Sequence, residues 1–169
     1  MEIWQVRKGE PAWCEQTVLV PGICVDLITW PSAGPGFICV TGLRNQSGGF
    51  LIPFDSTYIA QRYYETPTHF AQGLVYDYSQ AIVLDSEALV AYSVRTGEVK
   101  WSMQLSNALG MAHDSARKEV VLTTGAVVST TDGSTVRNLD PLEDCSSVAF
   151  LPGGGVIGIS RSGVIRLWE

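Results

Sequence analysis

Hydrophobic and polar positions form short alternating runs along the whole chain, a pattern that predicts β-strands. The pattern is clearest at 148–169, where apolar runs at 148–151, 156–159 and 164–168 are separated by a Pro-Gly turn and a Ser-Gly turn. No competing spacing of apolar residues indicates an amphipathic helix. The sequence therefore predicts an all-β protein.

Strands are expected along the whole chain, each bounded by residues that favour turns. Fully apolar runs, such as 37–40 and 81–84, are typical of strands that are buried on both faces. The expected strands lie at 3–6, 12–20, 25–30, 37–40, 50–54, 58–64, 74–76, 81–84, 88–94, 99–105, 111–113, 120–122, 126–129, 135–139 and the three C-terminal runs.

An internal repeat organises these strands. Corresponding positions recur about every forty residues, the period of a four-stranded propeller blade. Residues 4–13 also match residues 92–101 position by position. The recurring positions are Leu27, Leu74, Met111 and Val148 in one set, and Val40, Leu84, Leu122 and Ile159 in another.

These observations predict an all-β fold with one β-propeller domain over residues 1–169, built of about four four-stranded blades. With the strands of a blade lettered a to d from the centre outward, the approximate repeats are 1–22 (strands c and d), 23–67, 68–107, 108–144 and 145–169 (strands a, b and c). An unrelated all-β sandwich is the alternative fold.

The charge balance bears on possible partners. The chain has 11 basic and 17 acidic residues, and the basic ones are scattered, which argues against a nucleic-acid partner. No run is apolar for long enough to cross a membrane, and the first residues do not resemble a secretion signal. Cys14, Cys24, Cys39 and Cys145 show no paired spacing, so we expect free thiols and a cytoplasmic or nuclear location.

We find no convincing catalytic or metal-binding group in the sequence. His69 and His113 are the only histidines. His113 and Asp114 could position a general base, but both side chains could equally satisfy the backbone of a turn. No serine lies in a nucleophile-elbow pattern, and no cluster offers three metal ligands. We expect no enzymatic activity and no cofactor.

The tryptophans are expected to be structural, because their strand and turn positions recur and suit packing between blades. Stacking of a ligand on a tryptophan is the alternative. The expected structural positions are Trp4, Trp13, Trp101 and Trp168, with turn glycines Gly9, Gly97 and Gly163.

The C-terminal repeat resembles the WD40-repeat family. Residues 164–169 resemble the family's signature third strand, with Glu169 where Asp is usual, and residues 2–6 resemble the same strand of another unit. The Gly-His dipeptide of the family is absent, and Arg161-Ser162 replaces the expected turn Asp. The resemblance implies a protein-protein interaction scaffold built from degenerate repeats.

Residues 89–105 resemble equally a blade of the quinoprotein-like (YVTN) propellers. That resemblance implies docking between Gly and Trp of neighbouring blades, and an enzyme-related site in the central channel. Quinoproteins carry a quinone and a calcium ion, but the sequence has no vicinal cysteine pair and no cluster of acidic ligands for them.

The strand count suggests a partial propeller, because strand c occurs at both ends of the chain. An open arc of blades exposes sheet edges that can pair with another chain. We therefore expect a homodimer, or completion by another propeller fragment. A truncated propeller without independent function is a further alternative.

The leading functional hypothesis is a non-enzymatic module that binds proteins. In WD40 propellers the turns between strands b and c and the loops from d to the next a line one face of the ring. Side chains there suit an interface, although ordinary solvated loop residues are as consistent with the pattern. The candidates are Arg44, Glu87 and Arg161 in the turns, and Tyr64, Glu65, His69 and Asn107 in the loops.

Overall fold

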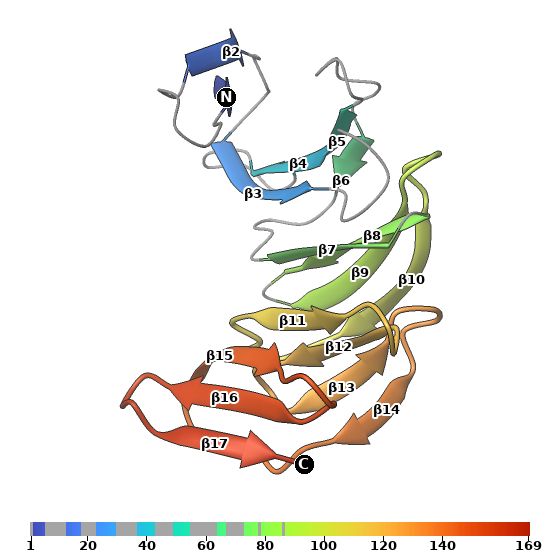
Figure 1. Cartoon of the computed structure of the whole chain (residues 1–169). Coiled ribbons are helices and arrows are strands. Elements are labelled where there is room, and N and C mark those ends of the chain that lie inside the picture. Colours follow the sequence, from blue (N-terminus) through green and yellow to red (C-terminus); the bar gives the residue numbers. More distant parts are fainter. Residues whose placement is uncertain are drawn as a thin grey trace. The chain divides into compact units, whose positions relative to one another are not determined.

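We describe the protein from a computed structural model (Figure 1). It describes the backbone of residues 2–5, 13–17, 23–29, 37–42, 49–54, 64–66, 73–77, 79–85 and 87–169, and the side chains of 79–85 and 87–169. These residues contain strands and no helix, so no described helix is long and apolar enough to cross a membrane. The prediction of an all-β chain is confirmed for this part. Contacts divide the chain into two compact units, Met1–His69 and Phe70–Glu169.

The described strands of the N-terminal unit form two antiparallel sheets. Strands β1 (Glu2–Gln5) and β2 (Trp13–Thr17) pair with each other. The second sheet has four strands in chain order: β3 (Ile23–Thr29), β4 (Phe37–Gly42), β5 (Gly49–Phe54) and β6 (Tyr64–Thr66). Of the strand expected at 58–64, residues 58–63 lie outside the described residues.

The C-terminal unit contains three antiparallel sheets, and in each of them consecutive strands are neighbours. The first has β7 (Gly73–Asp77), β8 (Gln80–Leu84), β9 (Ala88–Ser93) and β10 (Val99–Gln104). The second has β11 (Met111–Asp114), β12 (Glu119–Leu122), β13 (Ala126–Ser129) and β14 (Thr135–Asn138). The third has only β15 (Cys145–Phe150), β16 (Val156–Ser160) and β17 (Ile165–Trp168).

The recurring sequence positions occupy equivalent strands. Leu27, Leu74, Met111 and Val148 each lie in the first strand of a sheet, in β3, β7, β11 and β15. Val40, Leu84, Leu122 and Ile159 each lie in the second strand, in β4, β8, β12 and β16.

The core of the C-terminal unit lies between its stacked sheets (Figure 1). Buried residues of β8 and β9 pack with Val120 and Leu122 of β12. Val121, between them in sequence, packs instead with Val127 and with Val156 of β16. Successive side chains of a strand point to opposite faces, so β12 is apolar at 120–122 because a sheet lies on each side of it.

Candidate functional site

The turns and loops of the C-terminal unit form a continuous loop face at one end of the sheets. We define the loop face as residues 85 and 87 and the segments 105–110, 123–125, 139–144 and 161–164, which follow β8, β10, β12, β14 and β16. In an antiparallel four-stranded sheet the second and fourth strands run in the same direction, so both finish at the same end of the sheet. These five segments therefore lie together, although they are far apart in sequence.

Hydrogen bonds brace the loop face from one segment to the next. The amide of Leu105 donates to the carbonyl of Glu87 over 2.8 Å, and that of Arg161 donates to the carbonyl of Asp144 over 3.0 Å. The Thr123 hydroxyl accepts the amides of Leu109 at 2.8 Å and Gly110 at 3.3 Å. The backbone of this face is held in place by the sheets, as a binding surface requires.

Three of the candidate interface residues lie on the loop face with exposed side chains: Glu87, Asn107 and Arg161. Asn107 has a φ of 60°, a left-handed conformation that Asn tolerates better than most residues. Arg44 and His69 lie outside the described residues. Tyr64 was expected where the strand at 58–64 meets a loop, and Glu65 in that loop, but both lie in strand β6, where backbone pairing with β5 continues the sheet.

A hollow of about 580 Å³ opens beside Arg161 on the loop face. The Arg166 guanidinium at its wall donates to the carbonyl of Pro141 over 3.0 Å. The hollow combines acidic, hydroxyl and apolar groups and was not foreseen from sequence. Its lining consists of Pro141, Leu142, Glu143, Asp144, Ser160, Ser162, Val164 and Arg166.

Trp101 of β10 joins the first two sheets of the C-terminal unit. Its indole N–H donates to the carbonyl of Thr130 over 3.2 Å, and Gln80 Nε2 donates to the same carbonyl. A Cβ on Gly133 would lie 2.6 Å from Cε3 of the Trp101 ring, so the ring lies directly against this glycine. Gly133 was not foreseen from the sequence, although Asp132-Gly133 follows Thr96-Gly97 at nearly the repeat spacing.

The turns that contain Gly97 and Gly133 have the same hydrogen bonds. The amide of Gly97 donates to Ser93, and the amide of Gly133 donates to Ser129, while both glycines have φ near 75° (74° and 75°). Gly163 (φ 85°) lies in the turn between β16 and β17. All three adopt the left-handed conformation that glycine adopts without a steric penalty.

Trp4 and Trp13 lie in β1 and β2, and Gly9 lies outside the described residues.

Trp168 of β17 makes a second contact between sheets. Its indole N–H donates to the carbonyl of Asp140 over 3.0 Å, and the residue packs against Val121, Val127 and Val156. A Cβ on Gly158 would lie 2.6 Å from Cη2 of Trp168, so the ring crosses the neighbouring strand at the glycine.

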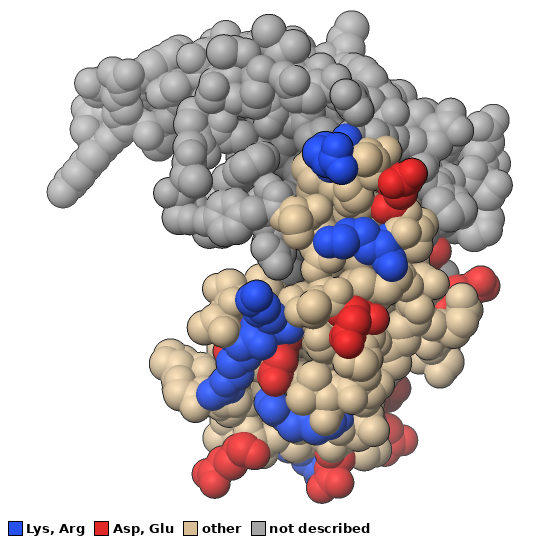
Figure 2. Space-filling model, turned by 90° about the vertical axis from the view of Figure 1, so that its right-hand side faces the viewer, with Lys and Arg blue, Asp and Glu red and all other residues tan. Residues whose placement is uncertain are grey.

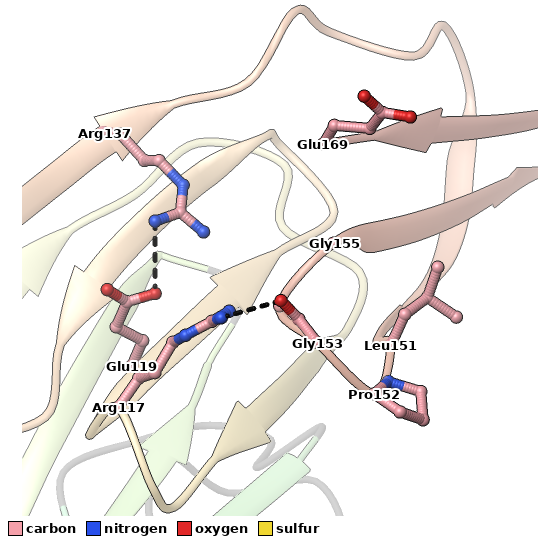
Figure 3. A pocket seen from close by; sticks show the side chains of 9 residues that line it. Arg117, Glu119, Arg137, Leu151, Pro152, Gly153, Gly155 and Glu169 are labelled. Atoms are coloured by element: carbon pink, nitrogen blue, oxygen red, sulfur yellow. Dashed lines mark hydrogen bonds and ion pairs between the residues drawn. The ribbon is translucent and has the colours of Figure 1, made fainter.

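A pocket of about 670 Å³ lies at the opposite end of the sheets from the loop face, beside the glycine-rich turn 152–155 (Figure 3). Arg117 donates to the Gly153 carbonyl over 3.0 Å, and Arg137 lies 3.4 Å from the Glu119 carboxylate. Among the nine described residues that line the pocket there is no Ser, Thr, Cys, His or Tyr that could act as a nucleophile. The arginines here hold the turn and a carboxylate in place.

Figure 2 shows the molecule from the side that is on the right in Figure 1. Basic side chains follow one another down the described part, with acidic side chains interspersed. The surface in this view has mixed charge, and such a surface lacks the single-sign field that attracts a polyanion.

The candidate general-base pair is separated in the structure. His113 and Asp114 are neighbours in β11, so their side chains point to opposite faces of the sheet. The Asp114 carboxylate accepts the amides of Ala116 at 2.9 Å and Arg117 at 3.2 Å, which closes the following turn. The described residues contain no group of three potential metal ligands, and Cys145 is a buried free thiol.

Comparisons with known proteins reveal relatives in structure only. No family model matches the chain, and no curated protein matches it in sequence. The crystal structure of BBS1N in complex with ARL6DN matches with a TM-score of 0.69 and 18% identity. That match covers 92% of this chain and 54% of the BBS1N chain.

Two further solved structures are similar. The WD40 domain of Pan2 from Neurospora crassa matches with a TM-score of 0.59 and 16% identity, over 88% of this chain and 50% of that chain. The computationally designed Ika4 protein matches with a TM-score of 0.63 and 16% identity, over 78% of this chain and 84% of that chain. The fold of this chain is therefore β-propeller-like, and the chain spans about half the length of the BBS1N and Pan2 chains.

Proposed function

We propose that this chain is a non-enzymatic, WD40-like propeller module that binds protein partners through its loop face. The observation that carries the proposal is the loop face itself, where segments from three sheets are braced by backbone hydrogen bonds. It exposes acidic Glu87, basic Arg161 and apolar Leu109, whose exposed fraction is 41%. A rigid surface of mixed chemistry suits recognition of a folded protein.

The assignment to WD40-like repeats is supported by residues 164–169 and by the similarity to the Pan2 WD40 domain. The partner class is supported at the level of fold, since BBS1N was crystallised with a protein, ARL6DN. We propose an intracellular protein partner, and neither nucleic acid nor membrane. The scattered basic residues of the sequence and its lack of a long apolar run support these exclusions.

The module is proposed to be part of a propeller that further sheets complete. The match to two propeller-like neighbours supports this, because the chain covers about half of each of them.

An enzyme-related, quinoprotein-like propeller is the second candidate. The contact of Trp101 with Gly133 favours it, because docking of Gly and Trp between blades is what that resemblance implies. Bound quinone or calcium in protein purified from its native host would support this candidate against the first.

The test of the first candidate is co-purification from the native host with a tagged chain, followed by mass measurement of the complex. We expect a stoichiometric protein partner with the wild-type chain and its loss with the double variant Glu87→Ala, Arg161→Ala. The matched control is Glu98→Ala, Lys100→Ala, which removes one exposed acid and one exposed base away from the loop face. Equal binding by all three proteins would refute the assignment to the loop face.

A further inference from the structure

The loop face carries an excess of acidic side chains. Its exposed charged residues are Glu87, Asp140, Glu143, Asp144 and Arg161. Four carboxylates and one guanidinium leave the exposed part of this face with a net charge of −3. A surface with one sign of charge in excess attracts a partner of the opposite sign and steers its approach.

The carboxylates of the loop face differ from those at the opposite end of the sheets, which have partners within the chain. There, Asp114 and Glu119 each pair with an arginine, at 3.8 and 3.4 Å. Glu98 and Asp132 accept hydrogen bonds from neighbouring hydroxyl groups. The four exposed carboxylates of the loop face form no hydrogen bond or ion pair with any residue that the structure describes, so they are available to a partner.

The hollow of about 580 Å³ on the loop face is lined by two of these carboxylates, from Glu143 and Asp144. The only cationic side chain among its described lining residues is Arg166. The Arg166 guanidinium donates to the carbonyl of Pro141 over 3.0 Å rather than to either carboxylate. The lining therefore keeps an excess of negative charge.

The backbone that carries the two carboxylates is fixed by hydrogen bonds. The amide of Cys145 donates to the carbonyl of Leu142 over 3.2 Å, and the amide of Arg161 donates to the carbonyl of Asp144 over 3.0 Å. Because the segment is already ordered, binding of a partner here costs less conformational entropy.

The lining also indicates which kind of cation fits. Two carboxylates are too few to hold a metal ion, and the described residues contain no group of three or more His, Cys, Asp or Glu side chains that could do so. Leu142 and Val164 add apolar surface to the hollow, and Val164 is 54% exposed. Lysine and arginine side chains combine an apolar stem with a cationic head, so they match both parts of the lining.

We propose that the loop face binds a basic surface of its protein partner, with one lysine or arginine side chain of that partner in the hollow. The inference rests on the proposed function and adds the chemistry of the partner to it. The head group of the bound side chain pairs with Glu143 and Asp144. Its stem packs on Leu142 and Val164.

The test is an NMR titration of the full-length chain with three capped tripeptides. The first probe is acetyl-Gly-Lys-Gly-amide, and the other two have norleucine or glutamate in place of lysine. We expect saturable shifts of the amides of 142–144 and 160–164 with the lysine peptide, weaker binding of the norleucine peptide, which keeps the stem without the charge, and no binding of the glutamate peptide. Added salt should weaken the binding of the lysine peptide.

A pair of variants assigns the binding to the hollow. The double variant Glu143→Gln, Asp144→Asn should weaken binding of the lysine peptide about fivefold, because two exposed ion pairs are lost. The matched control Glu98→Gln, Asp132→Asn removes the same charge from exposed residues at the opposite end of the sheets, and should leave the binding unchanged.

Three results would overturn the proposal: no saturable binding of the lysine peptide, equal binding of the lysine and norleucine peptides, or equal loss of binding in the two double variants. Co-purification separates this proposal from the proposed function. A partner that is lost with Glu87→Ala, Arg161→Ala but retained with Glu143→Gln, Asp144→Asn would keep the loop face as the interface and exclude the hollow.

Discussion

Substitution of Gly133 by alanine isolates the contact that joins the first two sheets of the C-terminal unit. The new Cβ would lie 2.6 Å from Cε3 and 2.9 Å from Cδ2 of Trp101. Real Cβ atoms do not approach a ring that closely, so the indole must move. Its N–H would then leave the carbonyl of Thr130, which it now reaches over 3.2 Å.

The expected cost has two parts that a control can separate. A left-handed backbone costs alanine about 1–2 kcal/mol relative to glycine. Overpacking against a fixed neighbour costs about 1–3 kcal/mol more. Gly163 has a similar φ of 85°, but a Cβ added there would have no neighbouring atom within 4 Å, so Gly163→Ala carries the backbone cost alone. Gly133→Ala should therefore lower the free energy of unfolding by about 1–3 kcal/mol more than Gly163→Ala.

The assay is urea denaturation followed by far-ultraviolet circular dichroism, with reversibility checked by dilution. A double-mutant cycle with Trp101→Ala completes the test, because removal of the ring removes the clash. In that background Gly133→Ala should cost no more than Gly163→Ala does. Equal costs at the two glycines in the wild-type background would refute the contact between Trp101 and Gly133.

Three other outcomes follow from the described side chains. Thr123→Val should lower the free energy of unfolding by about 1–3 kcal/mol, because the amides of Leu109 and Gly110 lose their shared acceptor. Thr123→Ser keeps the hydroxyl and should cost much less. Equal losses for the two variants in urea denaturation would contradict the role of the hydroxyl. Gly158→Ala should lower the free energy of unfolding by about 1–3 kcal/mol, because the new Cβ displaces the Trp168 ring. A change in tryptophan fluorescence would report the displacement. An unchanged spectrum and an unchanged stability would contradict the packing of Trp168 against Gly158. The Ser134 hydroxyl and amide donate to the Asp132 carboxylate and lower the pKa of that carboxyl. The stabilisation is therefore present above the pKa of the unfolded state and is lost as the pH falls through the pKa of the folded state. Ser134→Ala should raise the pKa of Asp132 in an NMR titration, and an unchanged pKa would exclude the hydrogen bond.

The positions of strands and turns could be predicted from the sequence because their causes are local. Alternation and apolar runs mark strands such as β8 and β12, and residues such as Gly97 and Gly163 mark turns that need a left-handed residue. The recurring positions, from Leu27 to Val148, predicted which strand of a sheet each run would form. The end of the strand expected at 58–64 was misplaced, because pairing with β5 extends β6 to Thr66, and pairing is not a local property.

The sequence alone also suggested tryptophans at strand positions and three exposed residues of the loop face, Glu87, Asn107 and Arg161. Only the tertiary structure decided what each group meets. Register and stacking bring Trp101 against Gly133 of the next sheet, and place Arg117 on the turn at Gly153. Stacking also buries Val121 and leaves Leu167 exposed, although both are aliphatic residues of sheet strands. Burial depends on which sheet lies beside a strand, and that is settled by contacts between distant residues rather than by the residues of the strand itself.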